Sequence, residues 1–317
     1  MAEVPSAPTP AHPRPAAAGP GDSERVPCPV CGQDAVRTWF TGPGYAMGAC
    51  RGCGLIRQQP RLTFEALRRG AYDTPKGDVT QGPVTFRPEA YEGLQNWESK
   101  PQEAFQGSVA AVEATLAPGE ARGLWLDVGC NTGGLLRAAR ERGFAVAGVD
   151  LSSELVAIAR ATHGADARVG SLSEARFADG AAAVVSYRQV LEHVHDLDAE
   201  LAEVGRVLAP GGRLLVEVPH GGGTRLAQDR VRVALRLMRR ERMLRNVPEH
   251  LYYFRARHLC AVLARHGFAP LSVGTYGRYR RRRSLPRRLW EAVRDRLRVG
   301  NKLRVVAQRG ATSRGPA

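Results

Sequence analysis

The chain has 317 residues, a formal net charge of +15 and 43% hydrophobic residues. This apolar content can bury a sizeable core, which excludes wholesale disorder, and the length fits one large domain or two of modest size. No apolar run reaches the roughly 18 residues that a membrane span requires. The N-terminus lacks the charged start and apolar stretch of a secretory signal, so we expect a cytoplasmic protein.

The positive charge is concentrated in two segments. Residues 278–317 carry a balance of +12, and residues 225–245 carry a balance of +6, so the rest of the chain is slightly acidic. Clustered arginines indicate an anionic partner, for which a phosphate-bearing small molecule, nucleic acid and an anionic membrane surface are the alternatives.

The first 60 residues divide into a tail and a cysteine-bearing module. Residues 1–24 contain six Pro and six Ala and almost no large apolar side chain, so we expect a disordered tail. Residues 25–60 contain the pattern C-x2-C-x18-C-x2-C, a spacing typical of a tetrahedral four-thiolate site that leaves no open position for catalysis. We therefore predict a small zinc ribbon that binds structural Zn²⁺, with a redox pair as the alternative; the ligands are Cys28, Cys31, Cys50 and Cys53.

Strands and helices are expected to alternate from residue 103 onwards. Residues 61–102 are expected to be a linker with one short helix near 63–70, residues 103–277 the core with a basic insert at 222–247, and residues 278–317 a basic segment plus the last strand. Short connections between alternating elements predict a doubly wound α/β fold with a mostly parallel sheet. The expected strands are 124–128, 145–149, 182–186, 213–218, 270–275 and 303–307, and the expected helices are 104–116, 132–142, 153–162, 196–208, 256–265 and a basic stretch around 286–298.

A glycine-rich turn follows the first of these strands, in the stretch from Asp127 to Gly133. Asn131 occupies a position where the dinucleotide-binding fingerprint needs glycine, and Asp127 would repel a pyrophosphate at short range. The next strand ends at Asp150, whose carboxylate can accept both hydroxyls of a ribose. A ligand with a cationic head and no phosphate fits this pattern, as in S-adenosylmethionine; the alternative is a structural turn with incidental glycines.

Later segments extend the pattern in the order D-x-G-x-x-x-G, V-D, Q-V-L-E-H-V and V-L-x-P-G-G. With these motifs, residues 103–277 and the strand at 303–307 resemble the class I S-adenosylmethionine-dependent methyltransferases. The resemblance implies a Rossmann-like sheet of seven strands and S-adenosyl-L-methionine as the cofactor. The positions that correspond to the family's cofactor contacts are Asp127, Gly129, Asn131, Gly133, Asp150, Leu151, Ser171, Leu172 and Gln189.

Candidate acid/base residues should lie at the carboxyl edge of the sheet. His193 follows the fourth strand and is either a base or a group that orders the loop. The segment Glu249-His250-Leu251-Tyr252-Tyr253-Phe254 forms either one wall of a substrate pocket or a packed helix approach. Together with the cysteine module, this segment resembles the nucleotide-sugar C-methyltransferases, which implies that Glu249 and His250 act as acid and base and that Tyr253 packs or lines the pocket.

The sequence therefore predicts a methyltransferase that acts on a small-molecule, sugar or glycan-linked acceptor, with phosphate on the acceptor as one option. One alternative is an RNA methyltransferase that uses the zinc module and the Arg-rich segment to hold nucleic acid, although an aromatic stacking platform is missing there. The other is a non-catalytic scaffold that binds the cofactor. The insert at 222–247 either covers the acceptor site or presents a solvated cationic face, and residues 278–298 are candidates for peripheral contact with an anionic membrane.

Overall fold

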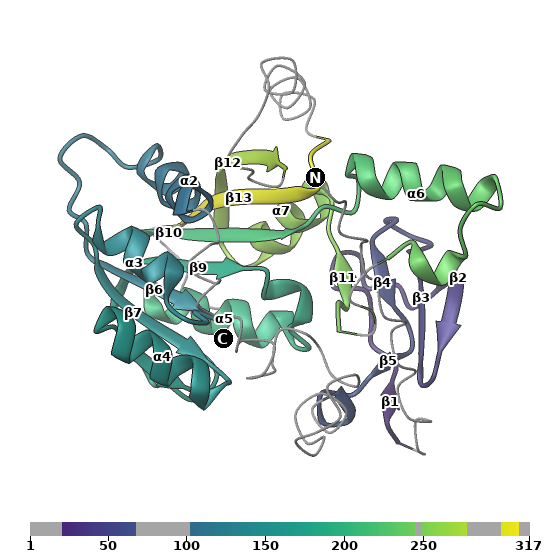
Figure 1. Ribbon diagram of the computed structural model, residues 1–317, viewed down its shortest axis with the longest axis horizontal. Coiled ribbons are helices and arrows are strands. Elements are labelled where there is room, and N and C mark those ends of the chain that lie inside the picture. The colour runs from purple at the N-terminus through teal and green to yellow at the C-terminus, as the bar shows by residue number, and fades with distance from the viewer. Residues whose placement is uncertain (1–20, 68–101, 245–246, 248, 278–298, 311–317) are drawn as a thin grey trace, which may run out of the picture.

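The computed structural model describes residues 21–67, 102–244, 247, 249–277 and 299–310. A large α/β unit occupies one side of the molecule, and a small β-rich module formed mainly by residues 23–62 lies beside it (Figure 1). Among the residues in these ranges, no helix has both the length and the apolar content needed to cross a bilayer.

Seven strands form the central sheet of the large unit. They are β6 (Leu124–Val128), β7 (Ala145–Asp150), β8 (Asp166–Val169), β9 (Ala182–Arg188), β10 (Leu208–Pro219), β12 (Phe268–Tyr276) and β13 (Lys302–Arg309). Their order is β12-β13-β10-β9-β6-β7-β8, and the pairs from β10 to β8 are parallel, whereas β13 is antiparallel to both of its neighbours. This confirms the predicted doubly wound, mostly parallel sheet. The direction of winding reverses between β6 and β9, where open sheets bind ligands beyond the carboxyl ends of their strands.

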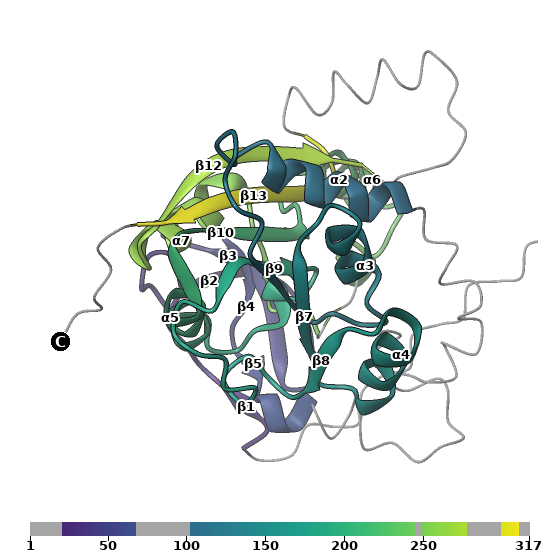
Figure 2. The same ribbon diagram turned by 90° about the vertical axis from the view of Figure 1, so that its left-hand side faces the viewer.

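Helices cover both faces of this sheet, with α2 and α3 on one face and α5 and α7 on the other (Figure 2). Ser152 caps the start of α4 by accepting a hydrogen bond from the amide of Leu155, and Gly164 ends the helix in a left-handed conformation. The helices are α2 (Gln102–Glu113), α3 (Gly134–Arg140), α4 (Ser153–His163), α5 (Leu197–Val207), α6 (Thr224–Ala234) and α7 (Ala256–Arg265).

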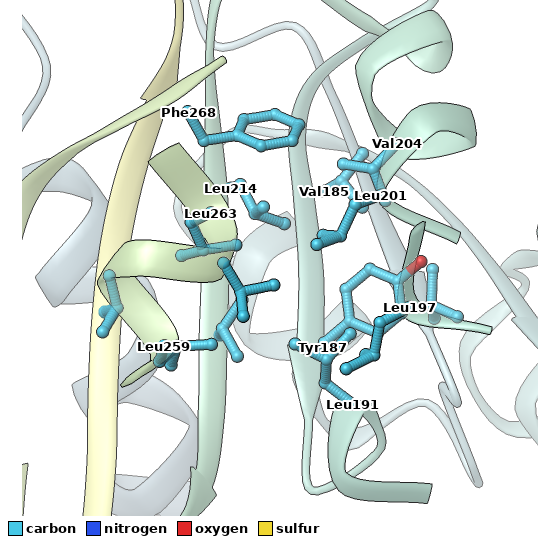
Figure 3. Packing of buried hydrophobic residues seen from close by; sticks show 14 of the residues in the cluster. Val185, Tyr187, Leu191, Leu197, Leu201, Val204, Leu214, Leu259, Leu263 and Phe268 are labelled. Atoms are coloured by element: carbon cyan, nitrogen blue, oxygen red, sulfur yellow. The ribbon is translucent and has the colours of Figure 1, made fainter. Parts of the chain in front are cut away.

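Successive side chains of each strand point to opposite faces of the sheet, and each face packs into its own apolar core. In β9, Val184 packs with α2 and α3, whereas its neighbour Val185 packs on the opposite face against α5 and α7. Figure 3 shows the second core, in which Tyr187 and Leu201 lie between the sheet and α5, and Leu263 lies on the α7 side. Because successive side chains of a strand point to opposite faces, a continuous apolar run predicts a strand covered on both sides, as observed.

The N-terminal module forms a second sheet with a strand from the large unit. This sheet has the order β11-β4-β3-β2, in which all neighbouring strands are antiparallel. Its strands are β2 (Val36–Gly42), β3 (Tyr45–Cys50), β4 (Ile56–Gln58) and β11 (Tyr252–Tyr253), and β1 (Ser23–Glu24) pairs separately with β5 (Arg61–Leu62). Since β11 comes from the large unit, the module is hydrogen-bonded into it.

Some expected boundaries differ from the structure. Ser23 and Glu24, which the sequence analysis assigned to the tail, form β1. The strand at 166–169 was not predicted as an element, because it is only four residues long and two of them are charged. In the linker, residues 64–67 are helical, in agreement with the start of the expected short helix. The expected basic helix around 286–298 and most of the expected tail lie outside the described residues.

Candidate functional site

The glycine-rich turn lies at the carboxyl end of β6, against the loop that follows β9. Gly129 has φ 71° and Gly133 has φ 85°, a region of backbone conformation that favours glycine. The amide of Gly129 donates to the carbonyl of Val149, which fixes the turn beside β7. A Cβ atom built on Gly129 would lie 2.4 Å from Cγ2 of Val190, so the close approach of the two loops depends on the missing side chain.

Asp150 holds the other side of this turn. Its carboxylate accepts hydrogen bonds from the backbone amides of Asn131, at 2.9 Å, and Ser152, at 3.0 Å. A carboxylate has about four acceptor sites, so these bonds leave acceptor capacity for a ligand hydroxyl. Asp150 is 8% exposed, and burial raises the pKa of its carboxyl group above the ordinary value. The next residue, Leu151, is 45% exposed and offers an apolar surface beside that carboxylate.

Asn131 occupies the position where glycine was the expected residue, with φ 52°. Asparagine tolerates this left-handed conformation because its short side chain can bond locally. Here its Oδ1 atom accepts from the amide of Thr132 at 2.8 Å. The substitution of asparagine for glycine is therefore compatible with the turn.

Asp127 points into the sheet at the base of the turn. Its Oδ1 accepts from Oγ of Ser186 at 2.6 Å, and that hydroxyl in turn accepts from the indole Nε1 of Trp125 at 2.8 Å. Asp127 is 3% exposed, and burial raises the pKa of its carboxyl group to about 7. Its side chain thus braces β6 against β9 from below the turn.

Three further predicted cofactor residues lie at the same edge of the sheet. Gln189 has φ 61°, and its side-chain amide donates to the carbonyl of Glu217 at 3.0 Å. Ser171 follows β8, and both its amide and its hydroxyl donate to the carboxylate of Glu174. Leu172 is fully buried in the main apolar core, so its side chain cannot line an open site and only its backbone could contact a cofactor.

These features fit an adenosyl cofactor. The turn brings backbone close to the sheet edge, Asp150 keeps acceptor sites for a ribose, and the exposed side chain of Leu151 stands where a flat base could stack. The structure brings Gly129, Asn131, Asp150 and Gln189 to one edge, as the sequence predicted. Which of them contact the cofactor stays a prediction.

Four titratable residues gather next to this edge, where the 3-10 helix η4 (Leu191–His193) meets the segment before β11. The rings of His193 and His250 are edge to face, with their centroids 4.7 Å apart. Nε2 of His250 lies 3.9 Å from Oε1 of Glu192, which is too long for a hydrogen bond. Nδ1 of His193 is 3.0 Å from the carbonyl of Glu249. The structure therefore brings the side chains of His193, His250 and Glu192 together, whereas Glu249 contacts His193 through its backbone carbonyl.

Burial shifts the pKa values of this group towards neutral forms. Desolvation raises the pKa of Glu192 to about 8 and that of Glu249 to about 7. Desolvation lowers the pKa of His193 to about 4. Desolvation, the proximity of the titratable His193 ring and the charge of Lys302 lower the pKa of His250 well below its ordinary value. Both imidazoles are therefore uncharged near pH 7.

Glu192 is the residue that the sequence analysis missed. It is 0% exposed, and neither of its carboxylate oxygens accepts a hydrogen bond from another of the described residues. Buried carboxylates without partners are rare and suggest a functional constraint. The sequence did place Glu192 beside His193 at the end of a strand, which could have marked it as a candidate site residue. A glutamate after a strand is more often a surface residue, however.

The N-terminal module helps to hold His250 in place. β11 pairs with β4, and the side-chain amide of Gln58 donates to the carbonyl of His250 at 3.1 Å. The aromatic residues of the expected pocket wall are buried by packing. Tyr252, Tyr253 and Phe254 are all at most 6% exposed. Of the two alternatives for these aromatics, the structure therefore favours packing over a substrate wall, since they join the module to the large unit.

The four cysteines of the two C-x2-C pairs converge in the module. Their sulfur atoms lie within 4.8 Å of one another, with Cys28 to Cys53 at 3.6 Å and Cys31 to Cys50 at 3.5 Å. A tetrahedral ion with bonds of about 2.3 Å needs sulfurs about 3.8 Å apart, so the spacing fits zinc. Gly32 and Gly54 follow the two pairs with φ 73° and 79°, as tight turns around such an ion require.

Ligand atoms of Glu192, His193 and His250 also lie within 4.8 Å of one another. A carboxylate and two neutral imidazoles are a donor set that divalent ions accept. This group therefore offers two chemical possibilities, proton transfer and ion binding, which the experiments below separate.

Comparison with known families gives a match over more than half of the chain. Residues 102–273 match the family described as "Methyltransferase domain". A C-methyltransferase, NovU, of Streptomyces niveus is 30% identical over 158 residues, which are 48% of this chain and 34% of that protein. A ubiquinone biosynthesis O-methyltransferase of Xanthomonas oryzae pv. oryzae is 38% identical over 98 residues, 29% of this chain and 41% of that protein. The matches thus span only about a third to two-fifths of these relatives.

Solved structures share the fold. In a complex of the Haloferax volcanii Trm112 methyltransferase activator with a putative methyltransferase, the similar chain has 18% identity and a TM-score of 0.51, over 70% of this chain and 97% of that chain. At this identity the likeness supports the Rossmann-like α/β architecture.

Proposed function

The chain belongs to the methyltransferase-domain family through residues 102–273, and from this premise we propose that it is an S-adenosylmethionine-dependent methyltransferase acting on a small-molecule, sugar or glycan-linked acceptor. The observation that carries this proposal is the juxtaposition of two groups of residues. The carboxylate of Asp150 and the buried titratable group around His250 lie at the same carboxyl edge of the sheet, where Gly129 approaches Val190 just before η4. This arrangement supports a ribose contact beside an acid/base group.

When bound, S-adenosylmethionine supplies an electrophilic methyl group and leaves as S-adenosylhomocysteine. The residues of this chain must orient the acceptor and accept its proton. The sequence resemblance implies an acid/base role for Glu249, and burial, which raises the pKa of its carboxyl group to about 7, is compatible with that role. The neutral imidazole of His250, or that of His193, can relay the proton or accept it directly. Glu192 lies beside His250, with Oε1 3.9 Å from Nε2, and is close enough to take part in a proton relay once the two groups approach each other.

The supporting comparisons are of a general kind. The matched relatives include a C-methyltransferase and O-methyltransferases, so they do not distinguish the atom that is methylated. The sugar or glycan acceptor rests on the sequence resemblance of the Glu249–Phe254 segment together with the cysteine module.

We also infer that the four cysteines bind structural Zn²⁺. The sulfur spacing and the positive φ values of Gly32 and Gly54 support this ion. Its role would be to stabilise the module. Strand β4 of this module pairs with β11, and Gln58 of β4 holds the backbone of His250.

The test is transfer of a labelled methyl group to a panel of nucleotide sugars, glycans, small phenols and acids, and RNA. Replacement of His250 by Gln is expected to reduce turnover by about 10²–10⁴-fold with little change in the affinity for S-adenosylhomocysteine. The matched control is His266→Gln, since His266 pairs with Asp198 outside this group. Labelling of RNA alone would favour the RNA methyltransferase, and cofactor binding without turnover on any substrate would favour the scaffold.

The same assay separates proton transfer from ion binding. Chelator treatment that abolishes turnover while the cysteine site keeps its zinc, followed by recovery on adding Fe²⁺ or Ni²⁺, would assign Glu192, His193 and His250 to an ion. Turnover that a chelator leaves unchanged supports the acid/base role.

A further inference from the structure

The basic insert is firmly anchored on one side. Leu226 of α6, together with Met243 and Leu244 after the 3-10 helix η5 (Arg240–Arg242), packs against Phe40 and Met47 of the module, and the three anchor residues are at most 8% exposed. The insert therefore has a fixed inner face and a fixed outer face.

The outer face of the insert is apolar at its centre. Val231 and Leu235 lie four residues apart, so they share one face of the helical turn. Their exposed fractions are 57% and 63%, and that of the nearby Leu237 is 74%. These are the three highest values for large apolar side chains in the described part of the chain, and they occur within seven residues. Isolated exposed leucines are ordinary, but such a cluster indicates a contact surface.

The turn that ends α6 keeps this face exposed. Arg236 adopts φ 58°, and the amide of Leu237 donates to the carbonyl of Arg232 at 2.8 Å. Glycine is the usual residue at such a left-handed position, and the residue after it usually packs back on the helix. Here an arginine holds the position and Leu237 points to solvent. Both departures from the usual pattern place a cation and an apolar side chain on the surface.

Exposed arginines lie next to these apolar residues along the chain. Arg236, Arg240 and Arg242 are exposed, and within the described ranges none of them has a carboxylate partner. By contrast, Asp229 pairs with Arg232 at 3.3 Å, and Glu241 lies 3.5 Å from Arg239. The surface thus combines exposed leucines with positive charge that is unpaired among the described residues.

We propose that this surface, formed by Val231, Leu235, Leu237, Arg236, Arg240 and Arg242, binds peripherally to an anionic phospholipid bilayer. A helical segment with apolar residues on its outer face and arginines next to them lies in the headgroup region, where the leucines leave water and the arginines meet lipid phosphates. Nucleic acid fits less well, because it would leave the leucines exposed and finds no aromatic platform among these residues. The inference concerns a surface outside the proposed catalytic group, so it holds or fails independently of the proposed function.

The proposed membrane-binding surface is connected to the edge of the sheet at which the candidate site lies. α6 follows directly after the carboxyl end of β10, the edge at which the candidate site lies (Figure 1).

The test is co-sedimentation of the full chain with vesicles of phosphatidylcholine alone and of phosphatidylcholine mixed with phosphatidylglycerol. We expect binding to the anionic vesicles to exceed binding to the neutral ones by at least about tenfold. The double variant Leu235→Ser/Leu237→Ser is expected to reduce that binding at least about tenfold, because both side chains leave water on binding. The matched control is Leu271→Ser, an exposed leucine of β12, which should leave binding unchanged.

A second variant tests the charge. Arg236→Gln/Arg240→Gln/Arg242→Gln is expected to weaken binding and to reduce its dependence on salt. All of these side chains are exposed, so the melting temperatures should match that of the wild type. Wild-type affinity of the double leucine variant for anionic vesicles would overturn the proposal. So would a wild-type chain that binds transfer RNA but neither kind of vesicle.

Discussion

Glu192 and His250 face each other inside the protein, with Oε1 and Nε2 3.9 Å apart, although they come from segments far apart in the sequence. The amide of Leu251 donates to the carbonyl of Glu192 at 2.9 Å, and this bond ties the two segments together beside the side chains. Pairing of β11 with β4 of the module then fixes the orientation of the His250 segment. The arrangement of the acid/base group therefore depends on the packing of the N-terminal module against the large unit.

Replacing Glu192 by Gln is expected to remove a pH-dependent destabilisation. Burial raises the pKa of Glu192 from 4.5 to about 8, so between these values the folded protein keeps a proton that the unfolded chain has lost. The contribution of Glu192 to the free energy of unfolding thus falls as pH rises through this window, by up to about 1.4 kcal/mol per pH unit. Glutamine has no such proton, so the variant should gain stability relative to the wild type towards about pH 8.

Urea unfolding at several pH values between about 5 and 8 measures this difference. Glu141→Gln is the matched control, since Glu141 is exposed and pairs with Arg137 at the surface. A constant difference between the Glu192 variant and the wild type across this range would contradict the buried, protonated state of Glu192.

Replacing Asp150 by Ala is expected to weaken the binding of S-adenosylhomocysteine at least about tenfold. Hydrogen bonds to a charged group are worth about 1.5–3 kcal/mol, and about 1.4 kcal/mol corresponds to a factor of ten. Isothermal titration calorimetry measures the change, with Asp166→Ala as the control because Asp166 is exposed and pairs with Arg168. Equal affinity of the Asp150 variant and the wild type would contradict the predicted contact between Asp150 and the ribose.

Replacing Cys50 by Ser is expected to abolish zinc binding and to lower the free energy of unfolding by more than about 3 kcal/mol, since the metal-bound state stabilises a module with a small core. Elemental analysis and thermal melts measure both effects. Cys260→Ser is the control, because Cys260 lies on α7, away from the sulfur cluster. Freshly purified wild-type protein without zinc would refute the assignment.

Replacing Gly129 by Ala is expected to destabilise the fold by about 1–3 kcal/mol and to impair cofactor binding. The added methyl group would meet Cγ2 of Val190 at 2.4 Å, and φ 71° is unfavourable for alanine. Gly274→Ala is the control, since no atom lies within 4 Å of a Cβ built there. Chemical denaturation and calorimetry with S-adenosylhomocysteine measure the two effects, and a variant that matches the control in both would show that the turn can relax.

Much of the large unit could be predicted from the sequence because the relevant signals are local. Apolar runs and helical periodicity located β6, β7 and α7, the last with its observed bounds Ala256–Arg265. The glycine turn was predictable since its conformation depends on the residues within it. Zinc-site spacing is local too, and it identified four cysteines whose sulfurs the fold brings together.

Contacts between distant segments decided the rest. The burial of Glu192, the packing of Tyr252–Phe254 against β4 and the enclosure of Leu172 all depend on which segments meet. The sequence placed arginines and leucines in the insert, but only the docking of Leu226 and Met243 on the module determined which of them face solvent. Periodicity is a property of neighbouring residues, whereas burial and pKa are set by what packs against them, so sequence alone determined the elements and the chemistry available, and tertiary structure determined how that chemistry is arranged.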